Sequence, residues 1–165
     1  MILGVDPGLA HTGWALLERG VLVAHGIVIT TRKRGVGDLQ RRLAEIGAGL
    51  HPQIHRSRHV VCEFPGGGFG RNAGAAAQVA AVAGVVIGQA WGSGRKVAAP
   101  APITWRAELG HARGADEALH AELLDRYPAI AALLLGHRPH VLDAIGLALY
   151  GERIANPQRH GDQDR

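Results

Sequence analysis

The chain has 165 residues and a mass of 17.4 kDa, which suits one domain with one sizeable core. Hydrophobic residues make up 47% of it, which excludes a chain that is merely a disordered tail. Cys62 is its single cysteine, which excludes an internal disulfide and a cysteine-based zinc site. Eighteen Lys and Arg against 14 Asp and Glu give a formal net charge of +4, which is compatible with a nucleic-acid partner without demonstrating one.

The first third of the chain predicts three antiparallel strands. An apolar run over residues 1–6 ends in an Asp-Pro-Gly turn, strand-like runs follow over 12–17 and 21–30, and residues 31–35 form a basic loop. The chain opens on this strand-like run and not on a basic segment followed by an apolar one. We therefore expect no signal peptide and a cytoplasmic protein, encoded either by a bacterium or by a phage.

The remaining two thirds predict helices that alternate with short strands. Apolar residues at helical spacing predict a helix over 36–50 that ends near Pro52. The later expected elements are a strand over 59–62, a Gly-rich loop over 64–70, a helix over 73–91, a strand over 96–99, and helices over 103–109, 115–127 and 139–154. This order predicts an α/β fold with a mixed sheet, in which an antiparallel meander of three strands joins parallel strands. We expect one domain over residues 1–155 and a polar tail over 156–165.

The expected helix over 73–91 is long enough to suggest a membrane span. It consists mostly of Ala and Gly and carries Gln78 and Gln89, so its apolar content is weak for the roughly 20 residues that a bilayer requires. We interpret it as a tightly packed interior helix or as a dimer-facing helix, and we expect no membrane partner.

Three acidic residues stand where carboxylates are not needed for packing. Asp6 ends the first apolar strand, and Glu63 directly follows the apolar strand over 59–62. Ligands of open α/β sheets bind at the carboxyl ends of parallel strands, so neighbouring strands would bring both acids into one crevice. Asp143 lies near the start of the last helix, on the same helix face as His140.

Each of these residues also has a simpler interpretation. Asp6 is a common turn former before Pro-Gly, Asp143 is favoured near a helix start, and a lone histidine such as His140 is most often solvated. Together they indicate a site of hard oxygen ligands, which favours Mg²⁺ or Mn²⁺. Two such ions about 3.5–4 Å apart are typical of phosphoryl-transfer sites. The sequence therefore predicts metal-dependent phosphodiester hydrolysis with two ions per active site.

Three segments surround these acids: Ile-Leu-Gly-Val-Asp-Pro-Gly over 2–8, Val-Val-Cys-Glu over 60–63 and Leu-Asp-Ala-Ile-Gly-Leu-Ala over 142–148. Together they resemble RuvC-type Holliday junction resolvases. The resemblance implies an RNase H-like fold, a homodimer, and paired symmetric nicks in four-way junction DNA with Mg²⁺ or Mn²⁺, and it allows a branch-migration motor as partner. Asp6, Glu63 and Asp143 match the family's acidic positions, and His140 stands where the family commonly has a fourth acid. The resemblance implies that these four residues are catalytic and bind the metal.

The resemblance also implies DNA contacts made by aromatic residues and their neighbours. Phe69, between two glycines, falls where family members place an aromatic residue that stacks on junction bases, and Arg71 lies close by. Phe64 is the competing aromatic, but its place next to Glu63 indicates a core residue. Trp105 lies in an apolar turn, so we expect it to pack in the core.

The expected basic contacts are less regular. Arg106 matches a family position that meets a phosphate, but the family's second basic position reads Gly-Ala-Asp-Glu over 114–117, where Arg113 is the available substitute. Other cations that could line the DNA path, or form only a solvated charged surface, are Arg32, Lys33, Arg34, Arg41 and Arg42.

Other functions stay open at this point. The same chemistry would serve an RNase H-like nuclease acting on other branched DNA or on RNA–DNA hybrids. A non-catalytic junction-binding protein is a further alternative, because His140 departs from the family's acids. Nucleotide-binding proteins of the actin and sugar-kinase fold need two lobes, and this chain is long enough for only one.

Overall fold

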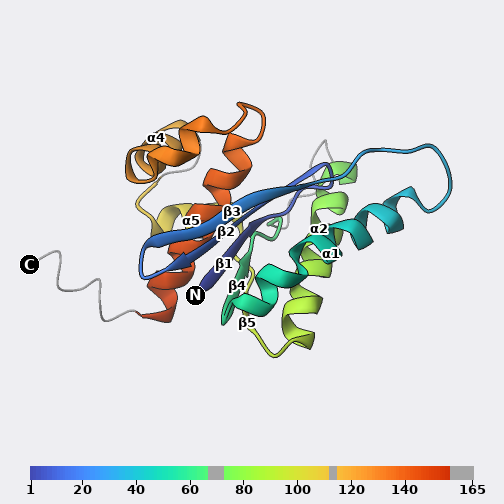
Figure 1. Ribbon diagram of the computed structural model, residues 1–165, viewed down its shortest axis with the longest axis horizontal. Coiled ribbons are helices and arrows are strands. Elements are labelled where there is room, and N and C mark those ends of the chain that lie inside the picture. The colour runs from blue at the N-terminus through green and yellow to red at the C-terminus, as the bar shows by residue number, and fades with distance from the viewer. Residues whose placement is uncertain (67–72, 112–114, 157–165) are drawn as a thin grey trace, which may run out of the picture.

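A mixed five-stranded sheet forms the centre of the molecule. The computed structural model describes residues 1–66, 73–111 and 115–156 (Figure 1). The strands are β1 (Ile2–Asp6), β2 (His11–Glu18), β3 (Val21–Ile29), β4 (His59–Cys62) and β5 (Lys96–Ala98), in the order β3-β2-β1-β4-β5. β1, β2 and β3 are antiparallel neighbours, β4 is parallel to β1, and β5 is parallel to β4. The predicted α/β fold with a mixed sheet is confirmed.

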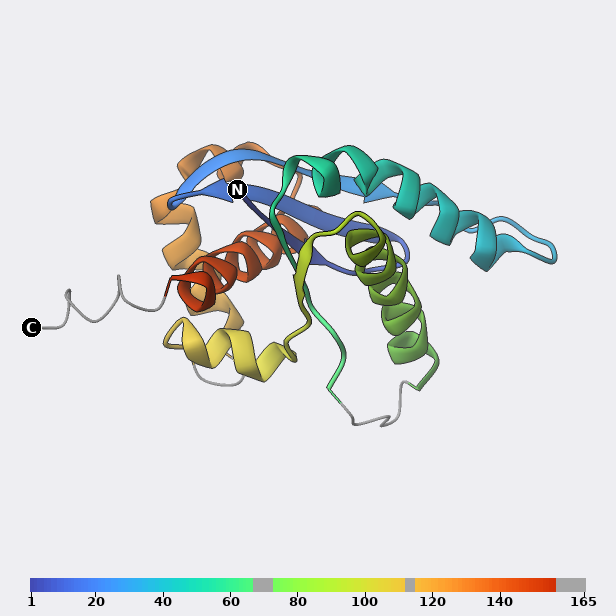
Figure 2. The same cartoon turned by 90° about the horizontal axis from the view of Figure 1, so that it is seen from below.

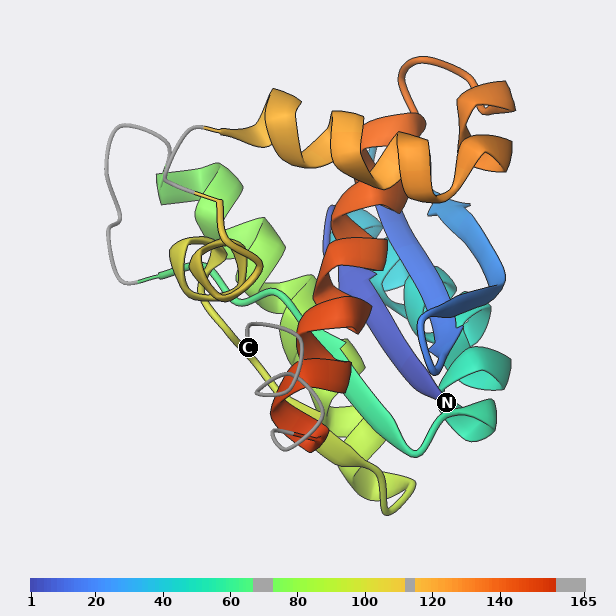
Figure 3. The same cartoon turned by 90° about the vertical axis from the view of Figure 1, so that its left-hand side faces the viewer.

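Helices cover both faces of this sheet. They are α1 (Asp38–Arg56), α2 (Ala73–Gly92), α3 (Pro102–Glu108), α4 (Asp116–Arg126) and α5 (Arg138–Ala155), and a short 3₁₀ helix, η1 (Pro128–Ala132), precedes α5. α1 and α2 lie on one side, and α5 lies on the other, where α3 and α4 pack against it (Figure 2). Seen from the side, α5 runs obliquely across the sheet (Figure 3).

The alternation of side chains along β1 divides the core into two halves. Ile2 belongs to the core beneath α5, whereas Leu3 and Val5 belong to the core beneath α1 and α2. β4 follows the same rule, since Val61 faces α5 and Val60 faces α1 and α2. Strands buried on both faces read as continuous apolar runs, which is why both were recognisable in the sequence.

Two glycines let α5 approach the sheet closely. A Cβ atom on Gly4 would lie 2.0 Å from the carbonyl oxygen of Ala144, and one on Gly13 would lie 2.1 Å from the carbonyl oxygen of His140. No side chain larger than hydrogen fits at either position. The first turns of α5 are thereby set directly against the backbones of β1 and β2.

The structure corrects the predicted end of α1. This helix begins at Asp38 and continues through Pro52 to Arg56. Proline lacks the N–H that would have bonded the carbonyl of Ala48, and its ring crowds that carbonyl. Both residues are exposed, so that carbonyl can be hydrated. The apolar contacts of Ile54, which is buried beyond the proline, keep the last turn on the sheet.

The prediction that α2 is an interior helix is wrong. Only Val82, Ala83, Val86 and Ala90 are buried, and Trp91 is exposed. By length and composition alone α2 could cross a membrane, yet only 22% of its most apolar window is buried inside this chain. One wide face of α2, made mostly of Ala and Gly, is therefore left without a partner within the described residues.

Candidate active site

Two of the predicted acids stand side by side at the carboxyl edge of the sheet. β1 and β4 pair in register with Val5 opposite Cys62, and the Glu63 N–H donates to the Val5 carbonyl oxygen at 3.1 Å, so Asp6 and Glu63 are next in line. Asp6 follows Ile2 and Gly4 on the α5 face, and Glu63 follows Val61 on the same face. Both carboxylates consequently point toward α5.

The first turns of α5 supply the other two predicted residues. His140 Nδ1 lies 2.6 Å from Asp6 Oδ2, and when Asp6 is ionised this nitrogen is the donor, because a carboxylate only accepts. Asp143, one turn later, lies on the same side of the helix and is only 18% exposed. The close contact of α5 with Gly13 is what brings His140 within reach of Asp6.

α3 adds an aromatic donor and a cation. The Trp105 indole, which is fully buried, donates its Nε1–H to Glu63 Oε2 at 2.8 Å. Arg106 lies over the Trp105 ring, its Cζ 4.4 Å from the ring centroid. Its guanidinium is 3.7 Å from Glu63 Oε2 and 3.6 Å from Asp143 Oδ1. Arg106 is therefore the positive charge between two of the three acids.

α4 contributes two further polar groups. His120 Nε2 lies 3.0 Å from Asp143 Oδ1, and Asp116 Oδ1 lies 2.9 Å from Arg106 Nε. Asp116 is mostly exposed, whereas His120 is 20% exposed. Arg106 thus contacts carboxylates from β4, α4 and α5 at once.

Burial and the repulsion of neighbouring carboxylates raise the pKa of Glu63 and of Asp6. Burial raises the pKa of Glu63 to about 7; the Trp105 hydrogen bond and Arg106 oppose this, and the charges of Asp6 and Asp143 add to it. Burial also raises the pKa of Asp6, against the hydrogen bond from His140. That same hydrogen bond raises the pKa of His140. The carboxylates repel one another, which means that they face a common space.

Several predicted DNA contacts lie beyond this group. Phe69, Arg71 and Arg113 fall outside the described residues. Arg32, Lys33 and Arg34 are exposed in the loop between β3 and α1. This loop leaves the sheet at the site's edge, because Thr30 Oγ1 donates to the Leu9 carbonyl oxygen in the turn after β1.

Two predicted placements near the site are wrong. Phe64 is 40% exposed and is not a core residue; among the described residues, the buried positions of α2 begin only at Val82. Arg42 is buried and donates its Nε–H to Thr30 Oγ1, so it fastens α1 to the sheet and cannot line a DNA path. The prediction that Trp105 packs in the core is confirmed.

Sequence reasoning missed the polar contacts of Trp105 and His120. The indole was expected to serve packing alone, and no motif contains His120. One signal was available: Leu119 and Leu123 are four residues apart, as in a helix whose apolar side faces the core, and His120 borders that side. That spacing does not reveal which acid the histidine meets.

The polar side chains of the site contact chiefly one another. Among the described residues, no group of three or more His, Cys, Asp or Glu side chains is arranged to hold a metal ion. The donor set still fits a hard divalent cation, since buried carboxylate oxygens that repel one another are stabilised by such a charge. Binding such a cation would require the Arg106 side chain to move out of the space between Glu63 and Asp143.

Comparison with known proteins decides the family. The family model described as crossover junction endodeoxyribonuclease RuvC matches residues 2–149. The chain belongs to the RuvC family. A RuvC from Sorangium cellulosum is 29% identical over 153 residues, covering 90% of this chain and 82% of that relative.

Solved RuvC structures share the fold. The structure of T. thermophilus RuvC in complex with a Holliday junction substrate superposes with a TM-score of 0.73 at 25% identity, covering 95% of each chain. The yeast mitochondrial Holliday junction resolvase Ydc2 superposes with a TM-score of 0.59, covers 99% of this chain and 86% of its own, and at 10% identity shows the fold alone. The RNase H-like fold that the resemblance implied is confirmed.

Proposed function

We propose that this RuvC-family chain is a nuclease that resolves Holliday junctions by hydrolysing phosphodiester bonds. The observation that carries the proposal is the meeting of three acids at the carboxyl edge of the sheet: Asp6 at the end of β1, Glu63 directly after β4, and Asp143 in α5. The T. thermophilus relative whose fold this chain shares was solved on a Holliday junction substrate, which supports the choice of DNA.

The proposed cofactor is Mg²⁺ or Mn²⁺, two ions per site, held by Asp6, Glu63 and Asp143 with His140 beside them. When bound, such ions activate the attacking water and stabilise the leaving 3′ oxygen. The chain's own residues do the rest: His140 orients the Asp6 carboxylate, and Trp105 orients that of Glu63. A phosphate is a better partner for the Arg106 guanidinium than two distant carboxylate oxygens, because its several oxygens can accept two parallel N–H hydrogen bonds from the planar guanidinium.

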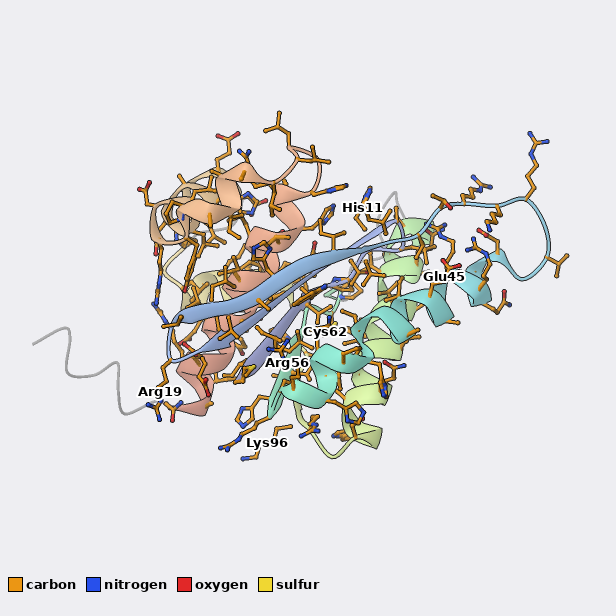
Figure 4. The ribbon with its side chains drawn as sticks, viewed as in Figure 1. His11, Arg19, Glu45, Arg56, Cys62 and Lys96 are labelled. Atoms are coloured by element: carbon orange, nitrogen blue, oxygen red, sulfur yellow. The ribbon has the colours of Figure 1, made fainter. Side chains whose placement is uncertain are left out.

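The loop between β3 and α1 is the proposed path of a DNA arm. Arg32, Lys33 and Arg34 lie together, all exposed, and this loop leaves the same edge of the sheet as the acids. Figure 4 shows His11, at the start of β2, near this edge and Arg19 at the far end of the sheet. Cations at this edge would attract the backbone of a substrate whose scissile phosphate reaches Asp6.

The exposed face of α2 is the proposed contact between two copies of the chain. Two cuts placed symmetrically across a four-way junction require two active sites related by a two-fold axis. Small residues allow close approach of two helices, and along this face Gly84 and Gly88 have no neighbouring atoms within 4 Å of where a Cβ would stand.

Cleavage of a synthetic four-way DNA junction in Mg²⁺ or Mn²⁺ tests the proposal. Matched duplex, branched and RNA–DNA hybrid substrates run in parallel, with Asp6→Asn as the inactive control. We expect paired symmetric nicks in the junction alone, and for Asp6→Asn intact junction binding without cleavage. Cutting of the hybrid or of plain duplex would overturn the substrate, and activity retained in Asp6→Asn would overturn the assignment of the site.

A further inference from the structure

Each of the three acids has a hydrogen-bonding partner of its own. His140 bonds Asp6 at 2.6 Å, Trp105 bonds Glu63 at 2.8 Å, and His120 bonds Asp143 at 3.0 Å. These bonds join β1, α3, α4, α5 and the residue that follows β4 around one space. The partner of Asp143 belongs to α4, which carries none of the segments that resemble the family.

His120 is held rigidly enough to fix what it touches. Leu119 and Leu123, its neighbours on α4, are each 1% exposed and anchor the helix in the core beneath α5. The imidazole is four-fifths covered, so the rotamers open to it are few. Its partner, Asp143, lies in the second turn of α5 and faces the sheet. The close contacts of α5 with Gly4 and Gly13 fix the position of the helix backbone there.

The contacts of Asp143 are divided unequally between its two oxygens. Within the described residues, His120 and Arg106 both approach Oδ1, at 3.0 and 3.6 Å. Oδ2 has no hydrogen bond or ion pair there. A carboxylate bonded in this way presents one oxygen in a fixed direction, as expected of a ligand whose orientation is set by an outer neighbour.

We propose that His120 is a positioning residue, which orients the Asp143 carboxylate so that Oδ2 is presented to the divalent cation. This inference rests on the proposed function, because it assumes that Asp143 binds the cation. It assigns His120 no contact with DNA and no proton transfer. The competing explanation is a purely structural bond that ties α4 to α5.

A second histidine–carboxylate pair provides a matched control. His111 Nε2 lies 2.9 Å from Glu122 Oε2, a bond that also involves α4 but meets an exposed carboxylate on the outside of the molecule. His111→Leu removes a bond of the same type and length without touching the acids. The His111→Leu variant therefore shows how much the loss of a histidine–carboxylate hydrogen bond by itself disturbs α4.

The experiment compares wild type, His120→Leu, His120→Gln and His111→Leu. Direct Mn²⁺ binding is followed by the electron paramagnetic resonance signal of the free ion, and junction cleavage is measured against Mg²⁺ concentration. Thermal unfolding in EDTA monitors the fold. We expect His120→Leu to weaken Mn²⁺ binding and to raise the half-saturating Mg²⁺ concentration by about 10- to 100-fold, the usual cost of losing an outer-shell partner. His120→Gln, whose amide Nε2 replaces the imidazole donor, should recover most of the loss, and His111→Leu should match wild type.

Each outcome decides the inference. Equal Mn²⁺ affinity in wild type and His120→Leu would overturn it, as would an equal loss in His111→Leu or the absence of Mn²⁺ binding by wild type. A wild type that binds Mn²⁺ but cuts no junction would instead count against the proposed function, and the Mn²⁺ comparison would still judge His120. If His120→Leu unfolds early, His120→Gln and its Mn²⁺ affinity carry the test.

Discussion

Replacing Glu63 by glutamine should stabilise the metal-free protein at alkaline pH. Burial raises the pKa of Glu63 to about 7, against an ordinary value of 4.5 that applies in the unfolded chain. Unfolding between pH 4.5 and about 7 therefore releases a proton, and the free energy of unfolding falls as the pH rises through this range. Glutamine has no charge to bury, and its Oε1 can still accept the Trp105 N–H.

The size of the effect follows from the two pKa values. At 1.36 kcal/mol per pKa unit, the difference between 4.5 and about 7 corresponds to about 3 kcal/mol. The Glu63 side chain is 16% exposed, so solvent screening reduces this figure little. We expect Glu63→Gln to exceed wild type by about 3 kcal/mol at pH 8 and by less than about 1 kcal/mol at pH 5.

Urea unfolding in EDTA at pH 5 and pH 8 measures this difference. Glu108→Gln, which changes an exposed carboxylate on α3, is the control and should match wild type at both pH values. Equal stability of wild type and Glu63→Gln at pH 8, or a lower stability of the variant, would refute the argument that the buried charge opposes folding. Saturating Mg²⁺ should raise the stability of wild type and not that of Glu63→Gln, because the cation binds the folded carboxylate.

Three other changes test separate parts of the structure. Gly13→Ala places a Cβ 2.1 Å from the His140 carbonyl oxygen. We expect the free energy of unfolding, measured in urea, to fall by about 1–3 kcal/mol and junction cleavage to fall sharply. Unchanged activity would contradict the close contact. Trp105→Phe keeps an aromatic ring but removes the hydrogen bond that lowers the pKa of Glu63. The pH–rate profile of cleavage should therefore move to higher pH, and a profile that stays in place would argue against this bond. Gly88→Arg should leave the fold intact and convert a dimer into a monomer in sedimentation, while Gly88→Ala stays dimeric; a wild type that sediments as a monomer would rule out α2 as the proposed contact.

The strands were predictable because burial on both faces leaves a simple mark. Runs such as Leu-Gly-Val before Asp6 and Val-Val-Cys before Glu63 are apolar at every position, and the acids that end them are conspicuous. Tertiary contacts explain the failures. Pro52 is tolerated because its surroundings are solvated, and the exposure of Phe64 depends on which part of α2 is buried, which begins at Val82 among the described residues.

The partners of the acids were harder to predict than the acids themselves. Asp143 belongs to a motif within one helix, but its bond to His120 joins residues 23 positions apart on two helices. Which turn of α4 meets α5 depends on the connection through η1 and on packing around Ile130, and no local pattern encodes that geometry. Residues that act through another residue leave little trace in a single sequence.

The composition of α2 has an energetic consequence for association. Alanine and glycine have no side-chain rotamers, so a surface built from them gives up almost no side-chain entropy when another surface covers it. Such a face also buries little area per residue, so its contacts become strong only if the two backbones come very near each other. Binding through α2 would therefore be inexpensive in entropy and highly sensitive to shape, and a single bulky side chain would weaken it more than the loss of any one contact.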